Sequence, residues 1–112
     1  MALLATALAT TVATAAAQDP NPMLQAVQAL APHPCNSETS DALRALGLLP
    51  GQIASARYMD NSTPAAVFFP PGIDVYVTIA GQSGTLVVQH RQGCRVAGTY
   101  TMGGLTLPHG PR

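Results

Sequence analysis

From residue 73 to residue 90 the sequence reads IDVYVTIAGQSGTLVVQH. In residues 73–80, apolar and polar side chains alternate, which is the pattern of a strand with one buried face. GQSG, residues 81–84, supplies the glycines of a turn or loop, and TLVVQH, residues 85–90, is rich in residues that favour strands. The stretch therefore predicts two strands and, with them, a sheet.

Further strands are expected before and after this stretch. QIASARYMD, residues 52–60, predicts an earlier strand, and AAVFFPPG, residues 65–72, a short apolar strand that ends at its two prolines. CRVAGTYTM, residues 94–102, predicts the last strand. Alternation would turn one set of its residues toward the core, namely Cys94, Val96, Gly98, Tyr100 and Met102.

One helix precedes the sheet, over about residues 38–46. Asn36 or Ser37 can cap its start, and Glu38 lies in the first turn, where the helix dipole favours an acid. Gly47 follows and ends the helix. The expected fold class is therefore α+β, with one short helix packed on a small, mostly antiparallel sheet of four to five strands.

The chain divides into a single globular domain, residues 35–104, with a segment on each side. Residues 18–34 hold four prolines and are expected to form a Pro-rich leader, either partly ordered or containing a short helix at about 22–30. Residues 105–112 contain many helix and strand breakers, which predicts a flexible tail.

The N-terminus predicts a signal peptide over residues 1–17. Residues 2–17 carry no charged side chain and end in Ala15-Ala16-Ala17, a small-x-small cleavage pattern. The run is shorter than the ~20 apolar residues of a membrane-spanning helix, so no stable membrane insertion is expected after cleavage. Export to the periplasm or the outside follows. The alternative is an Ala-rich helix kept in the mature protein.

The charges of the chain are few and balanced. Five arginines and five acids give a net charge of zero, and lysine is absent. Nucleic-acid binding needs clustered cations to neutralise phosphates, so nucleic acid is excluded as a partner. Binding to a membrane surface through a polybasic segment is excluded for the same reason. A surface with so little charge suits docking to another protein.

Cys35 and Cys94 are the two cysteines of the chain. In an exported protein an even pair predicts a disulfide. It would close a loop of about 60 residues, which chain entropy values at roughly 4 kcal/mol. His33 and His90 complete a Cys2His2 composition, but an oxidised pair cannot bind zinc. We therefore expect a disulfide, exposed histidines in turns, and neither a metal nor another cofactor.

The sequence contains no arrangement typical of catalysis. GxSxG is absent, no Gly-rich phosphate loop is followed by lysine, and Asp41 and Asp74 have no acidic neighbour with which to form a pair. We therefore expect a protein that is not an enzyme.

Seven short motifs occur between residues 35 and 104, beginning with a cysteine before the predicted helix and ending with a glycine. They are Cys35-Asn36, Leu46-Gly47, Pro71-Gly72, Val77-Thr78-Ile79, Leu86-Val87-Val88, Gly93 and Gly104. In this order they resemble the small serine-protease inhibitors of the potato inhibitor I (eglin-like) fold, which include secreted bacterial relatives.

The resemblance implies an extended inhibitory loop, in which Ile79 would fill the protease pocket and Ile79–Ala80 would be the bond presented. A rigid loop of this kind binds tightly because little entropy remains to be lost. Apolar Ile79 implies an elastase- or subtilisin-like serine protease as the partner. The loop would comprise Val77, Thr78, Ile79, Ala80, Gly81 and Gln82.

The alternative is that residues 73–80 form an ordinary strand and residues 81–84 its hairpin turn. The protein would then be a disulfide-stabilised accessory module of the cell envelope that binds a protein through its Thr-rich sheet face or its Pro-rich leader. The two hypotheses differ in geometry. An inhibitor would project residues 77–82 as an exposed loop, whereas a module would have residues 73–80 hydrogen-bonded on both sides.

Overall fold

The computed structural model describes residues 21–61 and 72–109. The expected signal peptide, and the expected strand at 65–72 apart from Gly72, lie outside these residues. The elements in order are α2 (Pro22–Leu30), α3 (Asn36–Ala45), η2 (Pro50–Gln52), β1 (Ile53–Asn61), β2 (Gly72–Ile79), β3 (Thr85–His90), η4 (Gln92–Cys94) and β4 (Val96–Met102).

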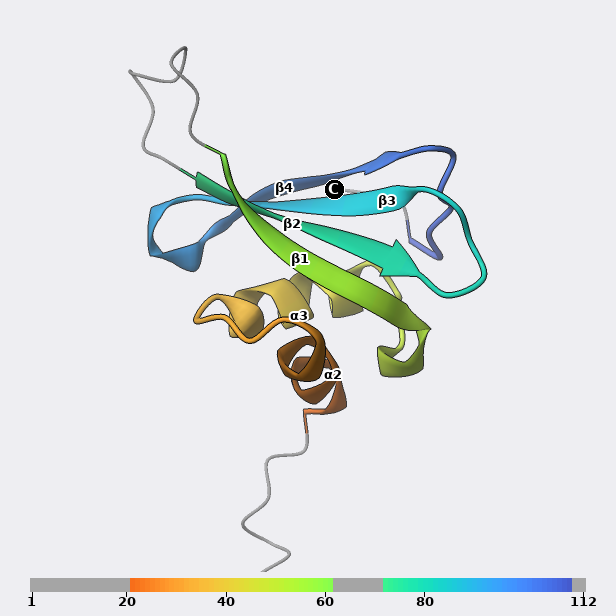
Figure 1. The fold of residues 1–112 in the computed structure, drawn as a ribbon, viewed down its shortest axis with the longest axis horizontal. Helices are drawn as coiled ribbons and strands as arrows, with labels where there is room; N and C mark the ends of the chain where they lie inside the picture. The colour runs from red at the N-terminus through yellow and green to blue at the C-terminus, as the bar shows by residue number, and fades with distance from the viewer. Residues whose placement is uncertain (1–20, 62–71, 110–112) are drawn as a thin grey trace, which may run out of the picture.

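The described residues form two layers, a helical layer and a sheet (Figure 1). The sheet has the order β1-β2-β3-β4, and each strand is antiparallel to its neighbours. The predicted α+β class is confirmed, with two helices on the sheet. The strands predicted at 52–60, 73–80 and 85–90 are confirmed to within one residue at each end.

Helix α2 confirms the short helix expected at 22–30. The Asn21 side chain caps it by accepting a hydrogen bond from the Leu24 N–H at 3.1 Å, and Pro22 occupies the first helical position, where its missing N–H costs nothing. Met23 and Val27 are buried. The helix of the expected leader therefore contributes to the core of the domain.

Helix α3 begins at Asn36, and Cys35 occupies the N-cap position without a side-chain capping bond. The predicted cap at Asn36 or Ser37 is therefore wrong. The Asn36 amide instead donates to Gln28 Oε1 and to the Ala31 carbonyl, so it joins the two helices. Gly47, with a φ of +84°, ends the helix as predicted, in a conformation that favours glycine.

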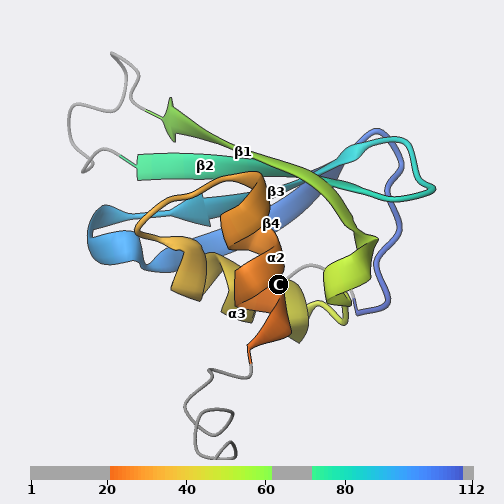
Figure 2. The same cartoon turned by 60° about the horizontal axis from the view of Figure 1, so that its bottom comes forward.

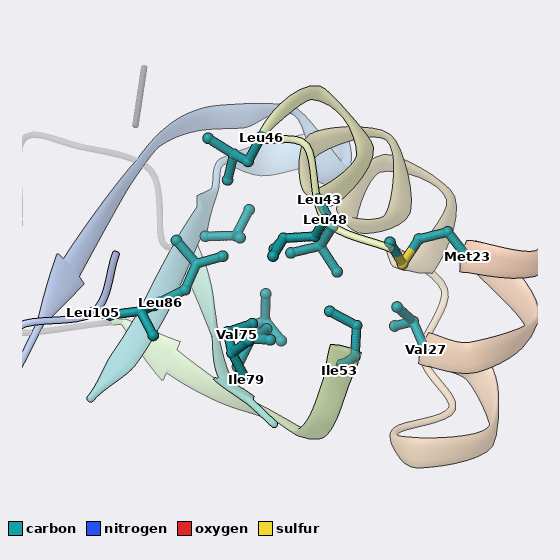
Figure 3. Packing of buried hydrophobic residues seen from close by; sticks show 12 residues of the cluster. Met23, Val27, Leu43, Leu46, Leu48, Ile53, Val75, Ile79, Leu86 and Leu105 are labelled. Carbon is teal, nitrogen blue, oxygen red and sulfur yellow. The ribbon is translucent and has the colours of Figure 1, made fainter. Parts of the chain in front are cut away.

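A single hydrophobic core lies between the two layers (Figure 3). The helices and the segment after α3 supply one side of it, and alternate residues of β2 and β3 supply the other, as the alternation predicts. Its buried members are Met23, Val27, Leu43, Leu46, Leu48, Ile53, Val75, Val77, Ile79, Leu86, Val88 and Leu105.

The last strand differs from the prediction at its start. It begins at Val96, and Cys94 lies before it in η4, half-buried and with a φ of +64°. The expected inward-facing strand position of Cys94 is therefore wrong. The chain needs the η4 turn to reverse direction between β3 and β4, so Cys94 belongs to the turn.

The predicted core face of β4 is also wrong. Tyr100 pairs with Val87 and Met102 pairs with Thr85, and both β3 residues point away from the helices. Tyr100 and Met102 are accordingly exposed. A register shift near His90 places Val96 opposite that residue, out of alternation with the rest of the strand.

The segment after β4 packs against the domain as far as His109. Leu105 is buried, and the Gln82 side chain exchanges two hydrogen bonds with the backbone of Thr106. The His109 N–H donates to the Leu46 carbonyl at 3.1 Å. The predicted flexible tail is therefore wrong for residues 105–109, because Leu105 closes the core; residues 110–112 lie outside the described part.

Candidate functional site

The expected inhibitory loop lies largely within strand β2. Val77, Thr78 and Ile79 belong to this strand, which pairs with β1 on one side and β3 on the other. Ala80, Gly81 and Gln82 form the exposed turn that follows. The Ala80 N–H donates to the Gln52 carbonyl at 2.8 Å, so the chain is held down at the point where the turn begins.

The side chain of Ile79 belongs to the hydrophobic core. It is 3% exposed and lies opposite Ile53 of strand β1 (Figure 3). Thr78 points to the other face of the sheet, where its hydroxyl lies 2.6 Å from that of Ser55. To fill a protease pocket, Ile79 would have to leave the core. The geometry is that of an ordinary inner strand followed by a hairpin turn.

In residues 21–61 and 72–109, one face of the sheet carries no helix. Helices α2 and α3 both lie against the opposite face, as the two views show (Figures 1 and 2). The strand pairing assigns fourteen residues to the uncovered side, which we call the helix-free face: Ser55, Arg57, Met59, Asn61, Gly72, Asp74, Tyr76, Thr78, Thr85, Val87, Gln89, Gly98, Tyr100 and Met102.

A row of paired residues crosses the middle of this face. Arg57 pairs with Tyr76, Tyr76 with Val87, and Val87 with Tyr100, so each strand contributes one member. We call these four residues the central row. Val87 is completely buried although it has no helix above it, because it lies between the two tyrosines. The row therefore presents the two tyrosines over a buried valine, with the arginine at one end.

The chemistry of the helix-free face is that of a protein interface. Interfaces are enriched in Tyr, Met and Arg and depleted in Lys and Glu, and this face contains two tyrosines, two methionines and one arginine with neither lysine nor glutamate. Its one acid, Asp74, is buried and accepts a hydrogen bond from the Asn61 amide. A hollow of about 440 Å³ lies on it, lined by Ser55, Ala56, Arg57, Tyr76, Thr78 and Thr85.

The phenol of Tyr100 stays protonated at neutral pH. Partial burial raises its pKa above the ordinary value, and the neighbouring Tyr76 and Asp74 raise it further. Tyr100 is 39% exposed. It can therefore offer both its ring and a hydroxyl donor to a partner.

A buried polar cluster lies on the opposite side of the sheet, between α3, β1 and β3. The Thr39 hydroxyl lies 2.9 Å from His90 Nε2 and 2.7 Å from the Tyr58 hydroxyl. Tyr58 in turn donates to Asn36 Oδ1 at 2.6 Å, and the ring of His33 stacks on that of Tyr58 at 3.8 Å. The cluster joins both helices to the sheet.

His90 is buried, so the prediction of an exposed turn histidine is wrong. Burial lowers its pKa below the ordinary value, and the nearby His33 lowers it further, whereas the backbone of Ile73 and the charge of Glu38 act in the opposite direction. The signal was in the sequence. His90 follows Leu86 and Val88 at alternate positions, which places it on the core-facing side of the strand.

The distance between the Thr39 hydroxyl and His90 Nε2, 2.9 Å, would suit a catalytic nucleophile and its general base, but both side chains are buried. Thr39 is fully buried and His90 is 2% exposed. A substrate cannot reach the hydroxyl without opening the domain. The contacts of the cluster are those of a group that fixes how the helices sit on the sheet.

The disulfide between Cys35 and Cys94 is confirmed, with a Cα–Cα distance of 5.1 Å. It joins the start of α3 to the turn before β4. Across residues 21–61 and 72–109, no three His, Cys, Asp or Glu side chains come together as a metal site would require. In the same residues, no helix has the length and apolar character needed to cross a membrane.

Comparisons with protein-family models, with curated proteins and with solved structures returned no match.

Proposed function

We propose that the protein is a small exported binding module without catalytic activity, which docks a protein partner on its helix-free face. The proposal rests on the central row, in which Tyr76 and Tyr100 flank a buried Val87 and Arg57 lies next to Tyr76, on a face that no described element covers. Tyrosine and arginine at the centre of a patch supply much of the binding energy of protein interfaces.

The disulfide supports the export part of the proposal. Such bonds form and persist in oxidising compartments, and the chain begins with a segment typical of a signal peptide. A periplasmic or extracellular site of action is consistent with both features. A small domain there benefits from the bond, since its core alone supplies limited stability.

The position of Ile79 favours this function over protease inhibition. An inhibitor of the kind that the resemblance implies presents its pocket-filling side chain on an exposed loop, and here that side chain is in the core. The exposed turn retains Ala80 and Gly81, which offer little side chain for a pocket.

The experiment compares a face variant with a turn variant. Tagged protein is incubated with extract of the compartment that receives it, and the retained partner is quantified for the wild type, for Arg57→Ala with Tyr100→Ala, and for Ser83→Asp. We expect the face variant to lose at least about tenfold in retention, because two contacts of the central row are removed. The turn variant should retain the partner as the wild type does.

A panel of elastase- and subtilisin-like proteases is assayed with the same three proteins. Slowed proteolysis that Ser83→Asp abolishes and the face variant leaves intact would contradict the proposal. Both variants are first compared with the wild type by thermal unfolding, since all three positions are at least partly exposed and the fold should persist.

A further inference from the structure

Arg57 is the one exposed charge among the residues of the helix-free face. The other charged residue of this face, Asp74, is 7% exposed and accepts a hydrogen bond from the Asn61 amide at 3.3 Å. In the described part of the chain, the single ion pair joins Arg44 to Asp41 on α3, so no described carboxylate pairs with the guanidinium of Arg57. The face therefore presents an unpaired positive charge beside its tyrosines.

The hollow on this face lies beside Arg57 and has no acidic residue in its lining. Apart from Arg57 and Ala56, the residues that line it all carry a hydroxyl group, namely Ser55, Tyr76, Thr78 and Thr85. The hydroxyls of Ser55 and Thr78 lie 2.6 Å apart, so one donates to the other, and the second proton can still be donated to a further acceptor. The lining therefore offers N–H and O–H donors without a negative group.

A carboxylate suits this set of donors. A guanidinium can bind a carboxylate through two parallel N–H···O hydrogen bonds, and hydroxyl groups can donate to the remaining acceptor sites of its oxygens. From Tyr76 the central row continues through Val87 to Tyr100, so an acid bound at Arg57 would have aromatic and apolar side chains on one side. The group that fits best is therefore an acid with apolar neighbours.

The position of the hollow favours the acid of a side chain over that of a chain end. A terminal carboxylate is typically captured by a nest of backbone N–H groups. The lining residues belong to β1, β2 and β3, which pair with one another through their backbones. The side chains of the hollow are therefore the groups that would hold a ligand, as they would hold an acidic side chain on the surface of a protein.

We propose that the hollow receives an aspartate or glutamate side chain of the protein partner. Its carboxylate binds Arg57, and apolar neighbours of the acid lie over Tyr76 and Tyr100. This inference rests on the proposed function and adds the chemistry of the partner. Complementary charges guide association and exclude wrong partners, so a partner with a cation at this place is rejected by Arg57.

The test is a selection from a display library of random segments of about twelve residues, held between fixed flanking sequences so that no segment has a free end. The targets are the purified, oxidised wild type, Arg57→Gln and Arg95→Gln. Arg95 is exposed and follows η4, outside the helix-free face, so its variant removes the same charge elsewhere. Thermal unfolding of both variants checks beforehand that they keep the wild-type fold.

We expect the wild type and Arg95→Gln to select segments in which aspartate or glutamate adjoins aromatic or aliphatic residues. Arg57→Gln should lose this preference for acids, because the cation that binds the carboxylate is gone. Segments selected by the wild type without a preference for acids would overturn the proposal. A preference that Arg57→Gln retains would overturn it as well, since the acid would then bind elsewhere.

The affinity of one selected segment measures the contact between the acid and Arg57 directly. The segment is synthesised with its acid and with the matching amide, and both are titrated by fluorescence anisotropy. On the wild type, the amide should raise the dissociation constant at least about tenfold, whereas on Arg57→Gln the change should stay within about twofold. Arg57→Lys should recover part of the affinity, because it restores the charge without the planar guanidinium. Equal effects of the amide on the wild type and on Arg57→Gln would contradict the contact.

Tyr100→Ala separates a failure of this inference from a failure of the proposed function. Segments that carry no acid but bind at least about tenfold more weakly to Tyr100→Ala would reject the acid and leave binding on the face standing. Segments whose affinity changes in neither Arg57→Gln nor Tyr100→Ala would reject both. A library that yields no binding segment would overturn the inference, and the retention experiment would then decide the proposed function by itself.

Discussion

His90 is kept neutral by its surroundings, which at the scale of single residues makes the domain sensitive to acid. It is enclosed by Thr39 and Tyr58, with His33 and Glu38 as the charged or titratable groups that affect it. Its Nδ1 atom is buried and has no hydrogen-bond partner among the described residues. A proton added to the folded protein would therefore place a charge where little compensates for it.

We expect the free energy of unfolding to fall in mild acid. The pKa of His90 is lowered in the folded state, so the unfolded chain takes up the proton first, near the ordinary value of 6.5. The contribution of His90 is complete above that pH and is lost as the pH falls toward the folded pKa. Urea unfolding at pH 7.5, 6.0 and 5.0 measures this loss, and His90→Asn should show a shallower decline. Equal declines in the two proteins would contradict the assignment.

The hydroxyl of Thr39 is expected to contribute strongly to stability. Thr39→Val keeps the shape of the side chain but removes the hydroxyl that pairs with His90 Nε2 and one of the two hydrogen-bond partners of the Tyr58 hydroxyl, which should cost about 1–3 kcal/mol. Thr78→Val is the control, because its hydroxyl lies in a more exposed pair with Ser55, and its cost should stay within about 0.5 kcal/mol. Denaturant unfolding measures the loss of unfolding free energy in both variants. Similar losses in the two would show that the buried hydrogen bonds of Thr39 contribute little to stability.

At the scale of elements, the sequence predicts the inner strands well and the last strand poorly. Residues 73–80 alternate without interruption, so β2 and its buried face follow directly from the pattern. In β4 an extra residue near the start changes which side chains face the core, and no periodic pattern records such an irregularity. The expected inward face of Tyr100 and Met102 was wrong for this reason.

The candidate site was predictable only in its general character. The Thr-rich side of the sheet was one expected binding surface, but the central row depends on strand order and register, which place Arg57 and Tyr100 on opposite edges of one row. These pairings arise from contacts between distant parts of the chain. A sequence pattern within one strand cannot supply them.

The hairpin between β2 and β3 depends on close contact with the segment after β4. An added Cβ at Gly84 would lie 2.5 Å from the Met102 carbonyl oxygen, and its φ of +95° is unfavourable for other residues. Gly81 has a similar φ of +80°, but no described atom lies within 4 Å of its added Cβ. The two glycines therefore have similar backbone conformations, but only at Gly84 would an added side chain clash with neighbouring described atoms.

Alanine at each position separates these two effects. Gly81→Ala should cost about 1–2 kcal/mol from the backbone conformation alone. Gly84→Ala should cost clearly more, because the carbonyl of Met102 must also move. Chemical denaturation of the two variants measures the difference. If Gly81→Ala proved the more destabilising, the contact between the hairpin and the end of β4 would be wrong.

At the scale of the whole molecule, the disulfide connects the helical layer to the far end of the sheet. Cys35 and Cys94 are 59 residues apart in sequence, and the bond ties the N-terminus of α3 to the turn that starts β4. The intact protein should weigh two hydrogens less than its reduced form. Reduction should lower the free energy of unfolding by about 2–5 kcal/mol, measured by urea unfolding with and without reductant. An unchanged midpoint would contradict this stabilising function.

In the function that we propose, the helix-free face, and not the helical layer, binds the partner. The most direct measurement is a photo-crosslinking scan in the cell, with the crosslinking residue placed in turn at Arg57, Tyr76 and Tyr100 on the face and at Ala29 and Asp41 on exposed positions of the helices. We expect adducts of one defined mass from the three face positions and none from the two helical positions. Adducts that form only from Ala29 or Asp41 would contradict it.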